Sequence, residues 1–161
     1  MPKNYDPQEV EPQLIDMWME AGAYRRSKGV GDCTVTIPPP NVTGMLHMGH
    51  ALDDTIQDTI VRYNRMKGYS TRWILGTDHA GIATQTKVDK KLKSEGISRL
   101  EIGREKFVDA CWDWTHEYGG IIVDQIKRMG CSVDFEGERF TMDPGYAKAV
   151  RKVFCDWYHD G

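Results

Sequence analysis

The stretch after residue 47 carries apolar side chains at helical spacing. Leu52, Ile56, Ile60 and Tyr63 follow one another at intervals of four, four and three residues, which places them on one face of a helix. Charged and polar residues fill most of the other positions, and Gly68 stands where a glycine commonly terminates a helix. The pattern predicts a long amphipathic helix that starts at the histidines near residue 47 and ends before Gly68.

A strand is expected on each side of this helix. The β-branched run at residues 34–37 precedes three prolines, which lack the N–H that a sheet requires, so the first strand must end at Ile37. Residues 70–75 predict a second strand. A strand, a helix and a strand of these lengths form a right-handed βαβ unit with parallel strands. The loops at residues 38–50 and 76–81 would then leave from the same carboxyl edge of the sheet, where ligands bind in open α/β folds.

The rest of the chain predicts mainly helices. Pro12 is compatible with the first helix only within its first turn, whereas Pro144 is well placed to start the last one. Gly119 and Gly120 indicate a break or a close contact within a long helix. Helices are expected at residues 8–24, 82–95, about 104–128 and 144–158, a third strand at 131–133 and a turn at 136–138. Three strands make a thin sheet, so the sequence predicts an α/β fold with about half of a doubly wound domain.

Composition narrows the class of protein. The chain has 161 residues, 40% of them hydrophobic and 28% charged, which is ordinary for a soluble globular domain. The net charge of −3 and the lack of a basic block give no indication of nucleic-acid binding. Four cysteines without a C-x-x-C pair favour reduced thiols in a cytosolic protein. No apolar run could span a membrane, and the start of the chain has no secretory signal.

Two histidines open the predicted long helix. His47 and His50 lie three residues apart and therefore share one face of the first turn. Free N–H groups and the helix dipole make this end an anion site, and Gly49 leaves room for a ligand to approach the backbone. Three interpretations stay open: histidines satisfied by local hydrogen bonds, a metal site completed by His79, and a nucleotide-phosphate site. Asp78 has two interpretations, which are compatible with each other: it caps the next helix, or it offers a carboxylate to a ligand ammonium group.

Three segments together resemble valyl-tRNA synthetases. They are IPPPNVTG at residues 37–44, LHMGH at residues 46–50 and GTDHAGIATQ at residues 76–85. The second is similar to the HIGH signature of class I aminoacyl-tRNA synthetases, and the other two are typical of the valyl members. The likeness runs from Tyr5 to the end of the chain and departs at residues 134–138, where the family usually has a Trp and an Arg.

This resemblance implies a particular fold and division of the chain. Residues 1–30 would form an N-terminal helical extension. Residues 31–161 would form the first half of a Rossmann-like catalytic domain with a parallel sheet core, ending near the start of the editing insertion. The family's chains are far longer, so the editing insertion, the second half of the domain and the KMSKS loop are expected elsewhere. The chain alone is therefore expected to bind ATP weakly and to be almost inactive.

The resemblance also implies a reaction. The valine carboxylate would attack the α-phosphate of ATP, accompanied by Mg²⁺, and valine would then pass from valyl-adenylate to tRNA(Val). The implied protein is a cytoplasmic monomer without a protein-bound metal or membrane contact. The implied catalytic residues are His47, His50 and Thr43, the ATP-binding residues are His47, Gly49 and His50, and the valine-binding residues are Pro38, Asn41 and Asp78.

Two other functions remain as alternatives. One is a small nucleotidyltransferase with an H-x-G-H site, which shares the chemistry at the α-phosphate. The other is a metal-binding or tRNA-docking module that uses His47, His50 and His79. The nucleotidyltransferase would not need the Asn41 or Asp78 segments, which therefore favour the synthetase over it.

Overall fold

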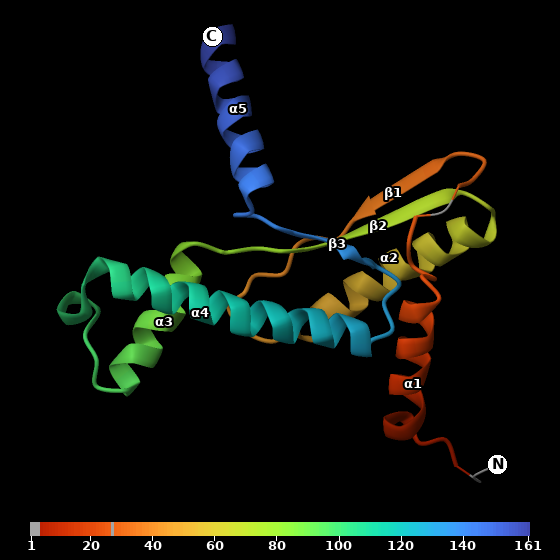
Figure 1. Cartoon of the computed structure of the whole chain (residues 1–161), viewed down its shortest axis with the longest axis horizontal. Coiled ribbons are helices and arrows are strands. Elements are labelled where there is room, and N and C mark those ends of the chain that lie inside the picture. Colours follow the sequence, from red (N-terminus) through yellow and green to blue (C-terminus); the bar gives the residue numbers. More distant parts are fainter. Residues whose placement is uncertain (1–3, 27) are drawn as a thin grey trace. The chain divides into compact units, whose positions relative to one another are not determined.

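A computed structural model describes residues 4–26 and 28–161 of the chain (Figure 1). The elements are α1 (Pro7–Glu20), β1 (Asp32–Thr36), α2 (Met48–Met66), β2 (Ser70–Thr77), α3 (Ile82–Ser94), α4 (Arg99–Arg128), β3 (Asp134–Phe140) and α5 (Pro144–Asp160). The predicted α/β class is confirmed. None of these described helices is long and apolar enough to cross a membrane.

The chain divides into two compact units. The first unit comprises Met1–Pro38, Leu46–Leu75 and Ile121–Glu138, and the second comprises Pro39–Met45, Gly76–Gly120 and Arg139–Gly161. The expected extension at residues 1–30 stays a prediction, and its residues 1–3 and 27 lie outside the described part of the chain.

The predicted parallel strand pair is confirmed. The sheet has the order β1-β2-β3, and β1 pairs in parallel with β2. The register runs from Asp32 opposite Ser70 to Thr36 opposite Ile74. Beyond the last pair, the Ile37 N–H still donates to the Ile74 carbonyl at 3.0 Å. The pairing ends there because Pro38 has no N–H to donate.

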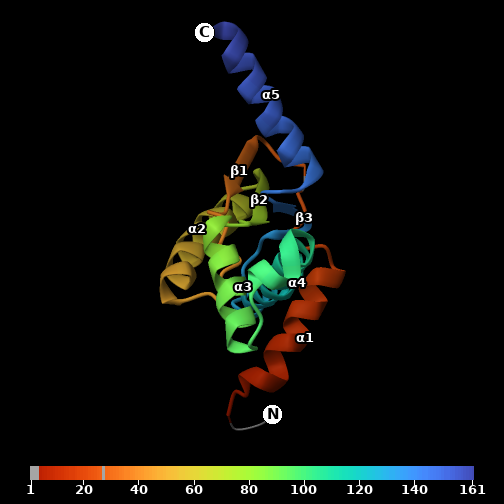
Figure 2. The same cartoon turned by 90° about the vertical axis from the view of Figure 1, so that its left-hand side faces the viewer.

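Helix α2 lies beside β1 and β2 and leaves its apolar stripe exposed (Figure 2). The exposed fractions are 65% for Leu52, 53% for Ile56, 49% for Ile60 and 58% for Tyr63. The buried face includes Asp54, which is 3% exposed, and Gln57 accepts a hydrogen bond from Trp73 Nε1 at 3.1 Å. An amphipathic helix usually buries its apolar stripe. In α2 the stripe is instead exposed, and the buried residues of the helix are Asp54 and Val61.

Polar bonds fix α2 to the segment that precedes β3. Ser132 is 1% exposed, its N–H donates to Asp58 Oδ1 at 3.0 Å, and its hydroxyl donates to the same oxygen. Arg65 donates to the Ser132 hydroxyl at 2.5 Å and to its carbonyl at 2.8 Å. A buried serine surrounded by an acid and a base thus replaces apolar packing at this contact.

The third strand lies further along the chain than predicted. A strand at residues 131–133 and a turn at residues 136–138 are both wrong, because β3 starts at Asp134 and contains that turn segment. The reason is a packing role for Gly137. A Cβ there would lie 2.6 Å from Arg72 Nη2 and 2.7 Å from Asp134 Oδ2. This glycine makes room for an ion pair between neighbouring strands and does not form a turn.

Several helix bounds also differ from the predictions. Helix α1 begins after Asp6, which accepts from the Gln8 N–H at 2.9 Å, and it ends at Glu20 before the predicted residue 24. Pro12 lies inside this helix beyond the first turn, so the expected restriction to that turn is wrong. Helix α4 begins at Arg99 because a kink at Gly103, with φ +80°, joins two helical pieces.

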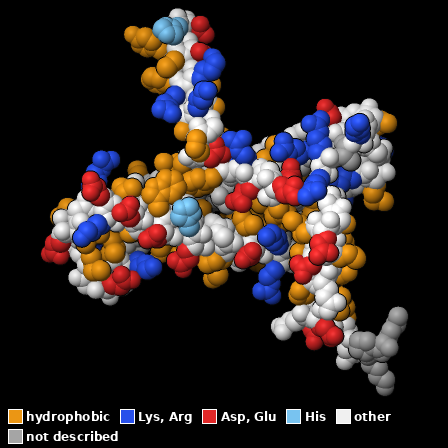
Figure 3. All heavy atoms as spheres, viewed as in Figure 1, with side chains coloured by type: hydrophobic (Ala, Val, Ile, Leu, Met, Phe, Trp, Pro, Cys, Tyr) orange, Lys and Arg blue, Asp and Glu red, His pale blue; other side chains and the backbone are white. Residues whose placement is uncertain are grey.

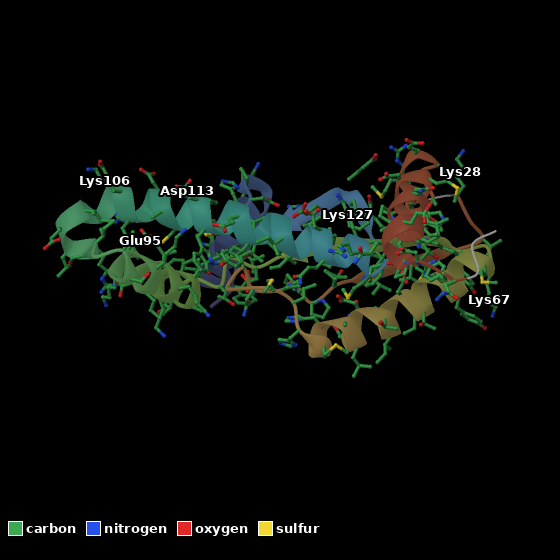
Figure 4. The ribbon with its side chains drawn as sticks, turned by 90° about the horizontal axis from the view of Figure 1, so that it is seen from below. Lys28, Lys67, Glu95, Lys106, Asp113 and Lys127 are labelled. Carbon is green, nitrogen blue, oxygen red and sulfur yellow. The ribbon has the colours of Figure 1, made fainter. Side chains whose placement is uncertain are left out.

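The two glycines within α4 do not break it. Residues 119 and 120 are helical, and a Cβ on Gly119 would meet Val42 Cγ1 at 4.0 Å, an ordinary van der Waals distance, so the position does not require a glycine for space. Lys106 and Asp113 point away from α3 on the outer side of α4 (Figure 4). Ile82, at the first position of α3, is 83% exposed.

Helix α5 starts as predicted and runs to the end of the chain. Asp143 accepts from the Tyr146 N–H at 2.7 Å, and Pro144 occupies the first turn. None of the described α5 residues is buried, and hydrophobic side chains lie exposed along it (Figure 3).

Candidate functional site

In the first unit, the two predicted histidines cap helix α2. His47 is the N-cap residue, and its Nδ1 accepts from the Gly49 N–H at 3.1 Å. His50 Nδ1 accepts from the His47 N–H at 3.2 Å, and the two ring centroids are 3.9 Å apart. In its neutral form, each imidazole ring therefore carries its single N–H proton on Nε2. The interpretation of local hydrogen bonding is confirmed, and each Nε2–H remains a donor.

The surroundings of this helix start favour the neutral form of His50. Partial burial, with a smaller contribution from His47, lowers the pKa of His50 below its ordinary value. Gly49 is needed beside these rings, because a Cβ there would lie 2.9 Å from His47 Cε1. Gly49 thus makes room for the His47 ring. Its role in ATP binding stays a prediction.

In the second unit, the proline-rich loop lies against the end of β2. Asn41 and Asp78 form a parallel β-bridge. The Asp78 N–H donates to the Pro40 carbonyl at 2.8 Å, and the Val42 N–H donates to the Asp78 carbonyl at 2.9 Å. Two of the predicted valine-binding residues are therefore brought together, although 37 positions separate them in the sequence.

The two carboxylate oxygens of Asp78 have different surroundings. Oδ1 accepts from the Ala80 N–H at 3.1 Å and from the Thr141 hydroxyl at 2.9 Å, and it lies 3.3 Å from His79 Nδ1. No described residue donates to Oδ2, and the side chain is 34% exposed. One oxygen is fixed within the protein, and the other can accept from a ligand.

Asp78 does not cap the next helix, so that alternative is wrong. Helix α3 starts at Ile82, its N-cap is Gly81, and it has no side-chain cap. The chain bends sharply before it, with φ +52° at Ala80 and +45° at Gly81. A positive φ at alanine is unfavourable and commonly marks a constrained functional turn. The bend keeps the Asp78 carboxylate beside the loop and out of the helix.

The remaining predicted residues occupy different positions. Thr43 is half-buried in the second unit, next to the fully buried Val42, whose carbonyl accepts from Trp114 Nε1 at 2.8 Å. Pro38 is exposed in the first unit, directly after the last paired residue of β1. The first unit thus holds Pro38 and the two histidines, and the second holds Asn41, Thr43 and Asp78. One shared crevice stays a prediction.

Sequence reasoning missed Thr141 as part of the site. It lies 63 positions from Asp78, and its residue type alone gave no signal. In the described part of the chain, no three His, Cys, Asp or Glu residues gather closely enough to hold a metal ion.

The second unit also contains a largely apolar pocket. Its volume is about 590 Å³, and its walls include His79, Phe107, Trp112 and Phe140. Trp112 and Phe140 lie edge to face with ring centroids 6.1 Å apart. The pocket is of the size that commonly accommodates a small organic group.

A parallel strand pair joined by a helix is the βαβ unit of open α/β folds. The sequence profile described as tRNA synthetases class I (I, L, M and V) matches residues 13–161. The chain therefore belongs to this class I synthetase family, and the predicted Rossmann-like fold is confirmed.

Within this family, curated valine–tRNA ligases are similar to the chain over nearly its whole length. The valine–tRNA ligase of Fusobacterium nucleatum is 52% identical over 161 residues, covering 99% of this chain and 18% of the relative. That of Porphyromonas gingivalis is 52% identical over 158 residues, again covering 18% of the relative. The chain thus spans less than a fifth of the length of these ligases.

A solved structure supports the fold independently. The leucyl enzyme in the crystal structure of the ternary complex of Agrobacterium radiobacter K84 agnB2 LeuRS-tRNA-LeuAMS superimposes with a TM-score of 0.78. It is 21% identical and covers 98% of this chain and 19% of its own. At this identity the likeness concerns the fold.

Proposed function

We propose that the whole protein activates valine with ATP and transfers it to tRNA(Val), and that this chain supplies the first half of the activation site. The observation that carries the proposal is the Asp78 carboxylate, which has one fixed oxygen and one without a described donor, within a chain about half identical to valine–tRNA ligases. The family membership leaves the small nucleotidyltransferase and the metal-binding module without support.

The free oxygen of Asp78 suits the ammonium group of an amino acid. An ionised carboxylate and an ammonium form a charge-assisted hydrogen bond that is stronger than a neutral one. Asn41 is held beside Asp78 by the β-bridge, so its side-chain amide is a candidate second contact. The Pro38 carbonyl is proposed as a third acceptor for the same ammonium group.

The capped start of α2 suits the ATP phosphates. His47 and His50 use Nδ1 for capping, which leaves Nε2–H as a donor on each ring. In the proposed reaction a valine carboxylate oxygen forms a bond to the α-phosphorus, and the bond to pyrophosphate breaks. The two donors would stabilise charge that grows on the phosphoryl oxygens, with Thr43 as a further contact.

The remaining substrates and the location are part of the same proposal. Mg²⁺ would accompany ATP, bound by phosphate oxygens, which it prefers as ligands. The adenylate would pass valine to the terminal ribose of the tRNA. We place the protein in the cytoplasm, where thiols stay reduced, because all four cysteines of this chain are free.

Valine-dependent exchange of pyrophosphate into ATP tests the proposal on the whole protein. Exchange is expected with valine and not with leucine, because the curated relatives that are about half identical to this chain are valine–tRNA ligases. Threonine is expected to support some exchange, since it is nearly isosteric with valine and an apolar pocket rejects it weakly. No valine-dependent exchange, or equal exchange with leucine, would contradict the proposal.

A further inference from the structure

Thr141 follows β3 directly and contacts both Asp78 and His79. Its N–H donates to the Thr77 carbonyl at 3.2 Å, which fixes its backbone beside the end of β2. Its hydroxyl oxygen lies 2.9 Å from Asp78 Oδ1, 3.0 Å from the His79 backbone nitrogen and 2.5 Å from His79 Nδ1. One hydroxyl therefore has three polar neighbours within hydrogen-bonding distance.

The hydrogen atoms in this group can be assigned by counting donors. A hydroxyl has one hydrogen to donate and two lone pairs to accept with. An ionised carboxylate can only accept, so the hydroxyl hydrogen must point to Asp78 Oδ1. The His79 N–H donates to one lone pair of the hydroxyl. The other lone pair faces His79 Nδ1, and this contact is a hydrogen bond only if Nδ1 carries a proton.

We infer that Thr141 is a positioning residue for Asp78 and holds neutral His79 in the form that is protonated on Nδ1. This inference rests on the proposed function for its catalytic meaning, whereas the hydrogen-bond arrangement stands on the contacts alone. The histidines at the start of α2 have the opposite form, because their Nδ1 atoms accept.

The arrangement explains which carboxylate oxygen receives the amino acid. The Thr141 hydroxyl and the Ala80 N–H donate to Asp78 Oδ1, and His79 Nδ1 lies 3.3 Å from the same oxygen. Rotation of the carboxylate would break these bonds, so Oδ1 stays with the protein and Oδ2 stays available to the ligand. Without the Thr141 hydroxyl, the carboxylate could rotate and would present a less defined acceptor to the ammonium group.

The tautomer of His79 tests the inference without any activity. Nitrogen NMR of the ¹⁵N-histidine-labelled chain at pH 8, above the ordinary titration range of histidine, distinguishes protonated Nδ1 from protonated Nε2. The expected spectrum shows His79 protonated on Nδ1, with His47 and His50 protonated on Nε2. His79 protonated on Nε2 would overturn the inference, and this measurement needs no variant.

Kinetics on the whole protein test the positioning role. Thr141→Val has nearly the shape of threonine without its hydroxyl, and we expect it to raise the KM for valine roughly 10- to 100-fold while the KM for ATP stays unchanged. Thr141→Ser keeps the hydroxyl and is expected to restore most of the affinity. Thr86→Val makes the same change on the exposed side of α3 and is the matched control.

The outcomes separate this inference from the proposed function. A valine KM for Thr141→Val equal to that of the parent, or no rescue by Thr141→Ser, would overturn the positioning role. An unaltered protein that shows no valine-dependent exchange would overturn the proposed function, and the NMR result would still decide the hydrogen-bond arrangement.

Discussion

Arg72 on β2 and Asp134 on β3 form an ion pair, with Nε donating to Oδ2 at 3.0 Å. The other carboxylate oxygen of Asp134 accepts from the Gly137 N–H at 3.1 Å. Asp134 therefore links the neighbouring strand to a glycine three positions further along its own strand. The absence of a side chain at Gly137 is what lets both bonds form.

Gly137→Ala should lower the free energy of unfolding by about 1 kcal/mol, because the new Cβ displaces an ion pair that is only partly buried. Chemical denaturation of the chain measures this difference. Gly120→Ala on α4 is the control, because a Cβ there meets nothing within 4 Å and alanine favours a helix. Equal stability of Gly137→Ala and the parent would show that β3 accommodates a side chain at this position.

Ser132→Ala should be more harmful, with a loss of about 1–3 kcal/mol, because it removes the buried hydroxyl that bonds to both Asp58 and Arg65 and leaves only the backbone bonds of residue 132 to them. The same denaturation experiment measures the loss. Ser94→Ala removes an exposed hydroxyl from the end of α3 and should change little. A neutral effect of Ser132→Ala would mean that solvent replaces these bonds.

Asp54 should make stability depend on pH. Burial, with a smaller contribution from Asp53, raises its pKa to about 6, and no described residue bonds to its Oδ2. The folded state therefore binds the proton more tightly than the unfolded state, whose ordinary pKa is near 4. Between these two pKa values the free energy of unfolding falls as the pH rises. Above both values the full cost of burying the ionised Asp54 carboxylate remains.

Asp54→Asn should remove this penalty and raise the Tm relative to the parent more at pH 8 than at pH 4.5. The matched control is Asp109→Asn, an exposed carboxylate on α4. Thermal unfolding of both variants and the parent across the pH range gives the comparison. A Tm difference between Asp54→Asn and the parent that is independent of pH would contradict the raised pKa.

His47→Asn should separate capping from catalysis in the whole protein. Asparagine is a good N-cap, so the stability should stay close to that of the parent. The imidazole donor is lost, and we expect the rate of valine-dependent exchange to fall roughly 100-fold. Parallel measurement of Tm and exchange rate tests this, and an unchanged rate would remove His47 from the proposed phosphate site.

The parts of the fold that were predictable are governed by local chemistry. The end of the first strand follows from Pro38, the end of α2 from Gly68, and the start of α5 from Pro144. The parallel pairing follows from the length of the connection between the strands. Each of these features depends on a few neighbouring residues, so the sequence pattern is sufficient.

The features that were missed depend on contacts across the chain. The exposed stripe of α2 could not be predicted, because periodicity identifies an apolar face but not what covers it. The sequence around Gly137 is typical of a turn. The contact between Gly137 and the side chain of Arg72 cannot be inferred from the sequence, because the two residues lie far apart in it. In the candidate site, Asp78 and Asn41 were found from their motifs, whereas Thr141 became visible only when the fold placed it beside Asp78.

The most direct test of the central claim is the KM for valine of Asp78→Asn in the whole protein, measured by pyrophosphate exchange. The substitution keeps the shape of the side chain and removes the charge that is proposed to hold the ammonium group. We predict a rise in this KM of roughly 100-fold with the KM for ATP unchanged, while Asp113→Asn on the outer side of α4 behaves like the parent. An Asp78→Asn protein with the parent's KM for valine would contradict the account.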